Sequence, residues 1–194
     1  MDNKIRVLLV DDNTIFASTL KEMFAPDKRL DYLGHASCRT SGIEMSCQMN
    51  PDIVLMDLNL SGTALDGIET AKEIRIKTGI RILLLTAYEK KDIILDASKR
   101  AFASGYIFKS HFKTLADIIY ETATSNTPAK EFIRELILQV LTPAERAIFD
   151  GLIEGDEYRY SHAEPSTIEK QKTSIYKKLR LKNKHELQKV FVNW

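Results

Sequence analysis

Cysteine is scarce in this chain, and its scarcity argues against several kinds of site. The two cysteines, Cys38 and Cys47, are too few and too far apart in the sequence for a zinc site or a redox motif. We therefore expect reduced thiols and a cytoplasmic location. The four histidines show no metal-ligand spacing either, and we expect them at the surface or in packing.

Long apolar runs are also lacking. Two acids follow the short apolar run at 5–10, so we expect neither a signal peptide nor a membrane span at the N-terminus. The sequence contains no internal repeat and no low-complexity segment. Its 194 residues suffice for one large domain or two small ones, each with its own core.

Net charge of either sign is nearly absent, since 28 Lys and Arg residues face 27 Asp and Glu residues. The balance therefore indicates no particular partner. Locally the charge is uneven, because residues 166–190 hold eight basic side chains against two acids. Such a run is either a contact surface for an anionic partner or a solvated face.

What the chain does contain is a regular alternation of short apolar runs with helical patterns. Strands are expected at 5–10, 31–37, 52–56, 80–86 and 104–109. Near-continuous apolar runs are typical of parallel strands that are buried on both faces. We therefore expect a doubly wound α/β domain with five parallel strands in the flavodoxin-like order 2-1-3-4-5.

Amphipathic helices should cover this sheet. Their apolar stripes are Phe16, Leu20 and Phe24, then Ile68, Ala71 and Ile74, then Ile93, Ile94, Ala97 and Ala101.

A small all-helical unit is expected after the polar stretch 125–131. The helical pattern at 131–140 either extends this linker or begins the next unit. The following helix has complete end signals, with Thr142 as N-cap, Pro143 in the first turn and Glu145 closing a capping box. Two more helices are indicated by the stripes Ile168, Ile175, Leu179 and Leu187, Val190, Phe191, Trp194.

Polar side chains gather where the predicted parallel strands end. Asp11 and Asp12 follow the first strand, Asp57 ends the third, Thr86 the fourth and Lys109 the fifth. These ends meet at one edge of a parallel sheet, so the five side chains should converge. Like charges at close range must keep a proton or share a cation, and hard oxygen ligands suit Mg²⁺. The set could hold a phosphoryl group, with a carboxylate as nucleophile.

Each of these residues also has a plainer interpretation. A single Asp at a strand end is more often a cap, a turn former or a solvated charge. The sequence Asp11-Asp12-Asn13 could simply form a polar turn into a helix. Five suitable residues at the ends of four strands nevertheless favour a chemical site.

Four short motifs extend this pattern, namely VDD at 10–12, MDLNL at 56–60, LLTA at 84–87 and FKS at 108–110. With them, residues 1–122 resemble the receiver domain of two-component response regulators.

The resemblance implies a role for each acid. Asp57 would accept phosphate from a sensor histidine kinase. Asp12 would bind Mg²⁺ directly, together with Asp57 and the main-chain carbonyl of Asn59. Asp11 would act through water.

The resemblance also implies how the signal is read. Thr86 and Lys109 would bind phosphoryl oxygens, and the ring of Tyr106 would move inward as Thr86 moves toward the phosphate. An ordinary half-buried strand aromatic is the alternative for Tyr106. One departure is Ser61, where the family usually has proline, in a loop with about two extra residues. We expect a more mobile loop, which affects the phosphate lifetime, and Tyr88 could shield the phosphate from water.

Residues 141–189 resemble the helical DNA-binding domain of the NarL/LuxR type. The resemblance lies in LTPAER, the glycine after the first helix and TIEKQKTSIYKKLRLKNKHEL. It implies a helix-turn-helix whose second helix enters the major groove. The implied DNA contacts are Lys170, Lys172, Thr173, Lys177 and Lys178.

This second resemblance is incomplete. The nine residues DEYRYSHAE at 156–164 would have to form both a scaffold helix and a turn, so the helix-turn-helix is shortened. Glu169 and Thr173 stand where the family usually has basic residues, and Glu169 could instead close a capping box with Ser166. Lysine contacts to phosphate would then confer affinity more than sequence choice.

The sequence therefore predicts a response regulator with a receiver at 1–122, a partly helical linker at 123–140 and a shortened DNA-binding domain at 141–194. Phosphorylation would convert it into a DNA-binding dimer that controls transcription, with no membrane partner. We expect no enzyme activity beyond self-phosphorylation and self-dephosphorylation. One alternative is a phosphorylation-controlled protein-binding module with a tail that reads no specific DNA. Another is a Mg²⁺-dependent phosphatase or phosphotransferase, although Asn59 stands where such enzymes usually carry a second aspartate.

Overall fold

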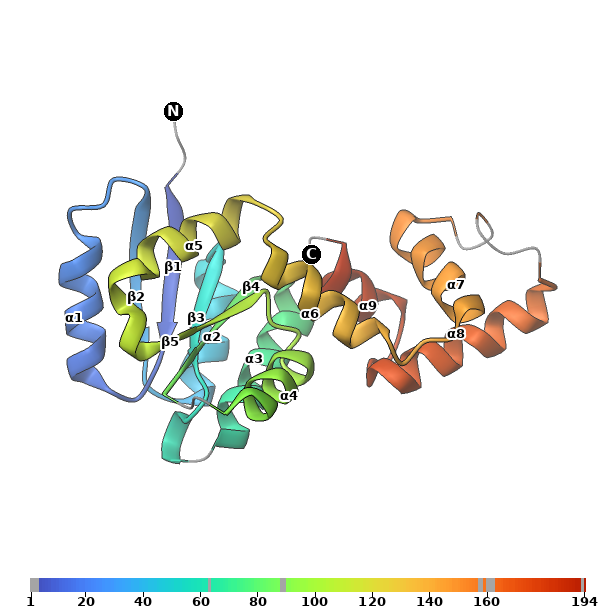
Figure 1. Cartoon of the computed structure of the whole chain (residues 1–194), viewed down its shortest axis with the longest axis horizontal. Helices are drawn as coiled ribbons and strands as arrows, with labels where there is room; N and C mark the ends of the chain where they lie inside the picture. Colours follow the sequence, from blue (N-terminus) through green and yellow to red (C-terminus); the bar gives the residue numbers. More distant parts are fainter. Residues whose placement is uncertain (1–3, 63, 88–89, 157–158, 160–162, 193) are drawn as a thin grey trace.

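A computed structural model describes residues 4–62, 64–87, 90–156, 159, 163–192 and 194. Its centre is a five-stranded parallel sheet in the order β2-β1-β3-β4-β5, which confirms the predicted order (Figure 1). Strands β1, β3 and β4 are buried over most of their length, as their apolar runs predict. The strands are β1 Ile5–Val10, β2 Leu30–Ala36, β3 Ile53–Asp57, β4 Arg81–Thr86 and β5 Gly105–Phe108.

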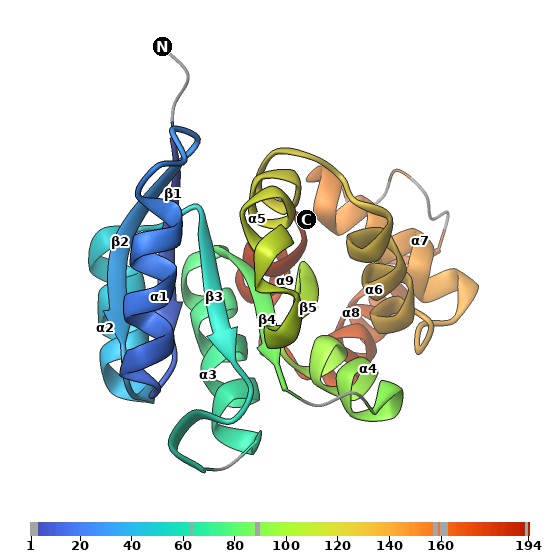
Figure 2. The same ribbon diagram turned by 60° about the vertical axis from the view of Figure 1, so that its left-hand side comes forward.

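Helices cover both faces of this sheet (Figure 2). Residues of α1 and α5 pack in one hydrophobic core with alternate strand residues, and residues of α2, α3 and α4 pack on the opposite face. The predicted stripes are buried except at Phe16, which is partly buried, and at Ile93, which is 38% exposed, so that part of the prediction was wrong. The helices are α1 Thr14–Phe24, α2 Arg39–Met49, α3 Ala64–Thr78, α4 Lys91–Arg100 and α5 Leu115–Thr124, with short 3₁₀ turns η1 Leu60–Gly62 and η2 Lys109–Thr114.

Four further helices, which we call the helical tail, follow the sheet. They are α6 Pro128–Leu138, α7 Pro143–Glu154, α8 Pro165–Leu179 and α9 Lys184–Phe191. The predicted capping box of α7 is present, with both hydrogen bonds between Thr142 and Glu145. The predicted capping box of α8 was wrong, because the helix begins at Pro165 with Glu164 as N-cap. Proline has a fixed φ and no N–H, and both properties suit the first helical position.

The helical tail does not stand apart from the α/β unit. Its core includes Phe102, which directly follows α4, and the rings of Phe102 and Phe191 meet edge to face at 5.9 Å. Helix α9 lies against α3, and α6 lies against α4 (Figure 1). Trp194 stacks on Phe191 at 5.3 Å, and its indole N–H donates to the carbonyl of Lys130. The predicted apolar face of α9 is therefore buried, and part of it contacts the α/β unit.

A buried arginine reinforces this contact. Arg75, at the end of α3, is fully buried and donates hydrogen bonds to the carbonyl oxygens of Gly79 (2.8 Å) and Val190 (2.6 Å). Burial, together with the nearby charge of Arg81, lowers the pKa of Arg75 to about 9.

None of the described helices is long and apolar enough to cross a membrane.

Candidate functional site

Three carboxylates converge at the carboxyl edge of the sheet. One oxygen from each of Asp11, Asp12 and Asp57 lies within 4.8 Å of the others. Asp11 is 0% exposed and Asp57 is 5% exposed, whereas Asp12 is exposed at the edge of the cluster. Strands β1 and β3 are neighbours in the sheet, as predicted, and their parallel pairing brings these residues together at its carboxyl edge.

One ammonium group reaches two of these acids. Lys109 begins η2 directly after β5, and its Nζ lies 2.8 Å from Asp11 Oδ2 and 3.1 Å from Asp57 Oδ2. The same Nζ lies 5.0 Å from the centre of the Phe16 ring. Burial lowers the pKa of Lys109, but the hydrogen bond with Asp11 and the charge of Asp57 outweigh it and raise the pKa overall. Lys109 is therefore a fixed cation beside two buried carboxylates.

The carboxyl group of Asp57 is subject to opposing electrostatic influences. Burial raises its pKa, the charge of Lys109 lowers it, and the charge of Asp11 raises it again. The hydrogen bonds from Lys109 and from the backbone N–H of Asn59 also favour the ionised form. The net shift is upward, so an additional positive charge at this cluster would stabilise the carboxylate.

The cluster has the features of a divalent-cation site. Asp11 Oδ1 accepts a hydrogen bond from the backbone N–H of Asn13 at 2.9 Å. Apart from Lys109, the buried Asp11 Oδ2 has no hydrogen-bond donor among the described residues. Buried carboxylate oxygens with spare lone pairs fit a hard cation such as Mg²⁺.

The polar-turn interpretation of Asp11-Asp12-Asn13 is also partly correct. Asn13 is the N-cap of α1, and its side chain accepts from the N–H of Phe16 at 3.0 Å. The capping role thus falls to Asn13, and the two preceding acids need not serve as caps.

The loop after β3 is held close to Asp57 by a glycine. A Cβ placed on Gly67 in α3 would lie only 2.2 Å from the carbonyl oxygen of Asp57 and 2.6 Å from that of Leu58. The helix therefore touches the backbone at the site. Leu58 and Leu60 are buried on either side of the exposed Asn59. The predicted mobility of this loop stays a prediction.

Thr86 and Tyr106 lie on neighbouring strands. Thr86 ends β4 and is fully buried, while Tyr106 on β5 is 40% exposed, with its ring edge to face with Phe108 at 6.1 Å. The Tyr106 ring is thus partly in solvent. Tyr88 lies outside the described residues.

The predicted DNA contacts on α8 differ in their surroundings. Lys178 Nζ lies 2.6 Å from Glu145 Oε2, and Lys172 Nζ lies 2.7 Å from Glu169 Oε1. Lys170 and Lys177 are exposed. Thr173 is exposed as well, and its hydroxyl donates to the carbonyl of Glu169 on the same helix. The described residues at 156–164 form no helix, as the short spacing predicts.

Sequence reasoning missed part of the role of Glu145. Besides capping α7, this 5%-exposed residue accepts hydrogen bonds from Ser174 Oγ (2.7 Å) and Lys178. Burial raises its pKa, but the bonds from Lys178 and Ser174 reverse the shift and lower it to about 2. The only signal in the sequence was the position of Glu145 in the capping box.

Comparison with known proteins places these observations in a family. Residues 7–120 match the response regulator receiver domain. A nitrate/nitrite response regulator protein homolog from Haemophilus influenzae is 31% identical over 144 residues. These residues cover 72% of this chain and 66% of that protein, so the chain matches just under two thirds of its length. The nitrate/nitrite response regulator protein NarL of Escherichia coli K12 is 26% identical over 200 residues, covering 93% and 91%. The structure of RcsB from Salmonella enterica serovar Typhimurium bound to promoter rprA has a TM-score of 0.56 and 20% identity, and covers 97% of this chain and 98% of that chain, a likeness of fold.

Proposed function

Since the chain belongs to the response regulator receiver family and is a NarL/LuxR-type response regulator, we propose that a sensor histidine kinase phosphorylates it on Asp57. The phosphorylated protein would control transcription through the helical tail. We propose the boundaries 1–122 for the receiver, 123–140 for the linker and 141–194 for the DNA-binding domain.

The contact of Lys109 with both buried carboxylates carries this proposal. An oxygen of Asp57 would form the new bond to phosphorus while the bond between phosphorus and the nitrogen of the donor histidine breaks. Lys109 favours the ionised form of Asp57 and so opposes the effect of burial on its pKa, and with Thr86 it would bind oxygens of the transferred group. Asp11, Asp12, Asp57 and the carbonyl of Asn59 would hold Mg²⁺, which supplies positive charge to the phosphoryl oxygens when bound.

Phosphorylation would act by favouring one of two arrangements. The phosphate adds about −1.5 to −2 charges at Asp57. Thr86 would move toward the phosphate, and the partly exposed ring of Tyr106 would turn inward behind it. The result would be a dimer with the helical tail available to DNA.

The exposed lysines of α8 support DNA as the partner of the tail. Lys170 and Lys177 can reach phosphates without breaking an ion pair with a described residue. RcsB, whose structure is bound to a promoter, supports the same partner for a protein of this fold. Phosphate contacts position a protein, so we propose binding that depends more on charge than on base sequence.

A second candidate function is a phosphorylation-controlled module that binds a partner protein. It is favoured by the short spacing between α7 and α8 and by the pairing of Lys172 and Lys178 within the tail. A phosphatase or phosphotransferase is less well supported, because Asn59 offers no general acid.

The first test is chemical. Treatment with acetyl phosphate and Mg²⁺ should add one acid-labile phosphoryl group, seen by intact-mass measurement. Asp57→Ala should gain none, whereas Asp31→Ala, which removes an exposed acid of β2, should gain one. Equal mass gain by Asp57→Ala would overturn the assignment.

The second test separates DNA from protein as the partner. Chromatin occupancy of the wild type should exceed that of Asp57→Ala, and affinity for DNA in vitro should fall steeply with salt. Absence of DNA binding at any salt concentration would favour the protein-binding module.

A further inference from the structure

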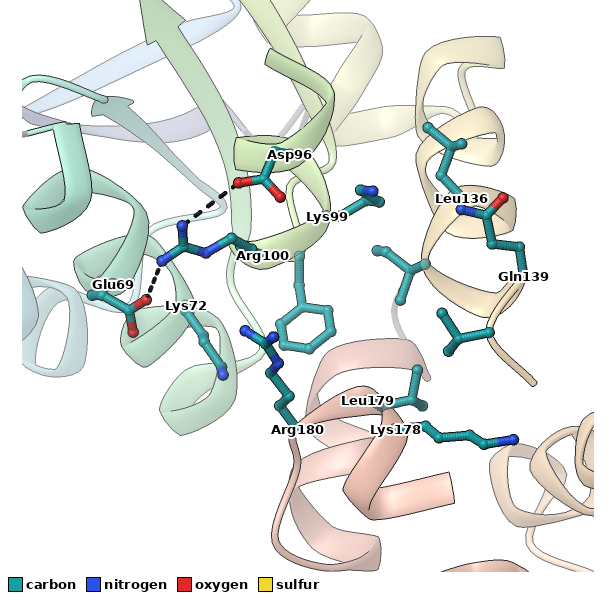
Figure 3. Close-up of a pocket in the computed structure, with 13 residues that line it drawn as sticks. Glu69, Lys72, Asp96, Lys99, Arg100, Leu136, Gln139, Lys178, Leu179 and Arg180 are labelled. Atoms are coloured by element: carbon teal, nitrogen blue, oxygen red, sulfur yellow. Dashed lines mark hydrogen bonds and ion pairs between the residues drawn. The ribbon is translucent and has the colours of Figure 1, made fainter. Parts of the chain in front are cut away.

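A cavity of about 240 Å³ lies between the receiver helices and the helical tail. Residues of α3 and α4 form one side, and residues of α6 and the end of α8 form the other (Figure 3). Five basic side chains line it against two acids. They are Lys72, Lys99, Arg100, Lys178 and Arg180, with Glu69 and Asp96.

The two acids do not neutralise this excess. Both are paired with Arg100, whose guanidinium lies 3.0 Å from Glu69 and 3.5 Å from Asp96. Lys178 has its own partner outside the cavity, since it pairs with Glu145. The remaining cations, which are Lys72, Lys99 and Arg180, form no ion pair with a described residue. Glu69 and Asp96 together carry one negative charge more than Arg100 neutralises, so the lining keeps an excess of about two positive charges, which repel one another and which an anion would balance.

The rest of the lining is apolar except for Gln139. Phe102, Leu136, Ile137, Val140 and Leu179 all contribute to it. An apolar lining with a few charged groups is typical of small-molecule sites, although this cavity, at about 240 Å³, is smaller than their usual range of roughly 300–1,000 Å³. The cavity therefore suits a small ligand that has an anionic group and an apolar or planar portion.

The position of Arg180 is a separate observation. It ends α8 with φ of +54°, a left-handed conformation in which glycine is the usual residue. Figure 3 shows its side chain, like that of Lys72, extending into the space between the receiver and the tail. Arg180 thus places a long cationic side chain at a position where the backbone conformation favours glycine.

We propose that this cavity binds a small organic phosphate, of mononucleotide size or smaller. Its phosphate lies among Lys72, Lys99 and Arg180, and its apolar portion lies against Val140 and Phe102. The ligand contacts the receiver and the tail at once, so it binds only where the two are in contact and favours that arrangement by mass action. This proposal rests on the contact between the two parts and is independent of phosphorylation at Asp57.

Isothermal titration calorimetry on the full chain tests the site with three probes, inorganic phosphate, AMP and adenosine. EDTA in the buffer prevents the probes from binding the acidic cluster through a divalent ion. AMP should bind saturably and more tightly than either inorganic phosphate or adenosine. Lys72→Ala combined with Arg180→Ala should weaken AMP binding by about tenfold for each positive charge removed.

Matched variants separate the site from a general charge effect. Lys177→Ala removes an exposed lysine of the same helix outside the cavity and should leave AMP binding unchanged. Val140→Ser should weaken AMP but not inorganic phosphate. Lys99→Ala, a single change, provides a second test should the double variant fold poorly.

Two results would overturn the proposal. One is the absence of saturable binding of AMP and of inorganic phosphate at concentrations up to about 10 mM, because a dissociation constant above that value would be too weak for a small-molecule site. The other is equal AMP affinity in the wild type and in folded variants that lack Lys72, Lys99 or Arg180.

Discussion

Substitution of Gly67 by alanine should disturb the phosphorylation site from inside α3. The added Cβ would meet the Asp57 carbonyl oxygen at 2.2 Å, and real contacts of this kind are not shorter than 3.0 Å, so helix and strand end must separate by about 0.8 Å. Alanine favours the helix by roughly 1 kcal/mol over glycine, whereas overpacking costs about 1–3 kcal/mol. The carbonyl oxygens of Asp57 and Leu58, which this Cβ would meet, belong to the backbone and cannot rotate away. We therefore expect a net loss of up to about 2 kcal/mol in the free energy of unfolding.

The same displacement should slow the chemistry. A misplacement of about 1 Å near a reacting group can cost about a hundredfold in rate, so acetyl phosphate should label Gly67→Ala at least tenfold more slowly. Urea unfolding and timed intact-mass measurements give the two quantities.

Gly42→Ala is the matched control for this experiment. It is also a helix glycine, but its Cβ would meet Val10 Cγ1 at 2.9 Å and Cγ2 at 3.2 Å, which are side-chain atoms and not the backbone of Asp57. It should be labelled at the wild-type rate. A Gly67→Ala variant that gained about 1 kcal/mol from helix propensity and was labelled normally would refute the reasoning.

Three further predictions concern charge. The pKa of Asp57 is raised in the folded state above its ordinary 3.8, so the folded protein binds this proton more tightly than the unfolded chain does. The free energy of unfolding therefore falls as the pH rises above 3.8 and Asp57 ionises. Without divalent ions Asp57→Asn should therefore have a higher urea midpoint than the wild type at pH 7, with the difference shrinking toward pH 3; a lower midpoint at pH 7 would contradict this. Lys109→Ala should retain Mg²⁺ binding but fail to dimerise when phosphorylated, and dimerisation equal to wild type in analytical ultracentrifugation would argue against its role. Lys170→Ala plus Lys177→Ala should flatten the salt slope of DNA binding by about two. Lys178→Ala should leave this slope nearly unchanged. It should instead lower the free energy of unfolding by about 1–3 kcal/mol, because the buried carboxylate of Glu145 loses its partner. Competition binding at several salt concentrations distinguishes the two cases.

The sheet and the acidic cluster could be predicted because each depends on short stretches of sequence. Apolar runs specify buried parallel strands, and the ends of such strands converge wherever the order is 2-1-3-4-5. Asp11, Asp57 and Lys109 therefore meet as the sequence suggests, at distances that only the structure gives. The error at Ile93 has a simple cause, since periodicity indicates an apolar stripe but not how wide a stripe the neighbours cover.

Contacts between distant segments could not be predicted. No local pattern pairs Lys178, one of the predicted DNA contacts, with Glu145. Arg75 would be expected at the surface from its charge, yet it is buried against a carbonyl oxygen of α9, which only the docking of the tail supplies. The start of α8 was missed because Ser166 and Glu169 satisfy the capping-box spacing as well as the true boundary does.

Helix α3 sets a constraint on insertions and deletions in this chain. It touches the backbone of Asp57 at Gly67, and just beyond its end a Cβ on Gly79 would lie 3.0 Å from the carbonyl oxygen of Lys189 in α9. One residue inserted between these glycines would rotate everything after it by about 100° and shift it by about 1.5 Å, which would turn Arg75 away from Val190. The loop before α3 is expected to carry about two residues more than the family usually has, so we expect that its length can vary. Insertions should thus be tolerated up to the start of α3 and rejected between its two contact glycines.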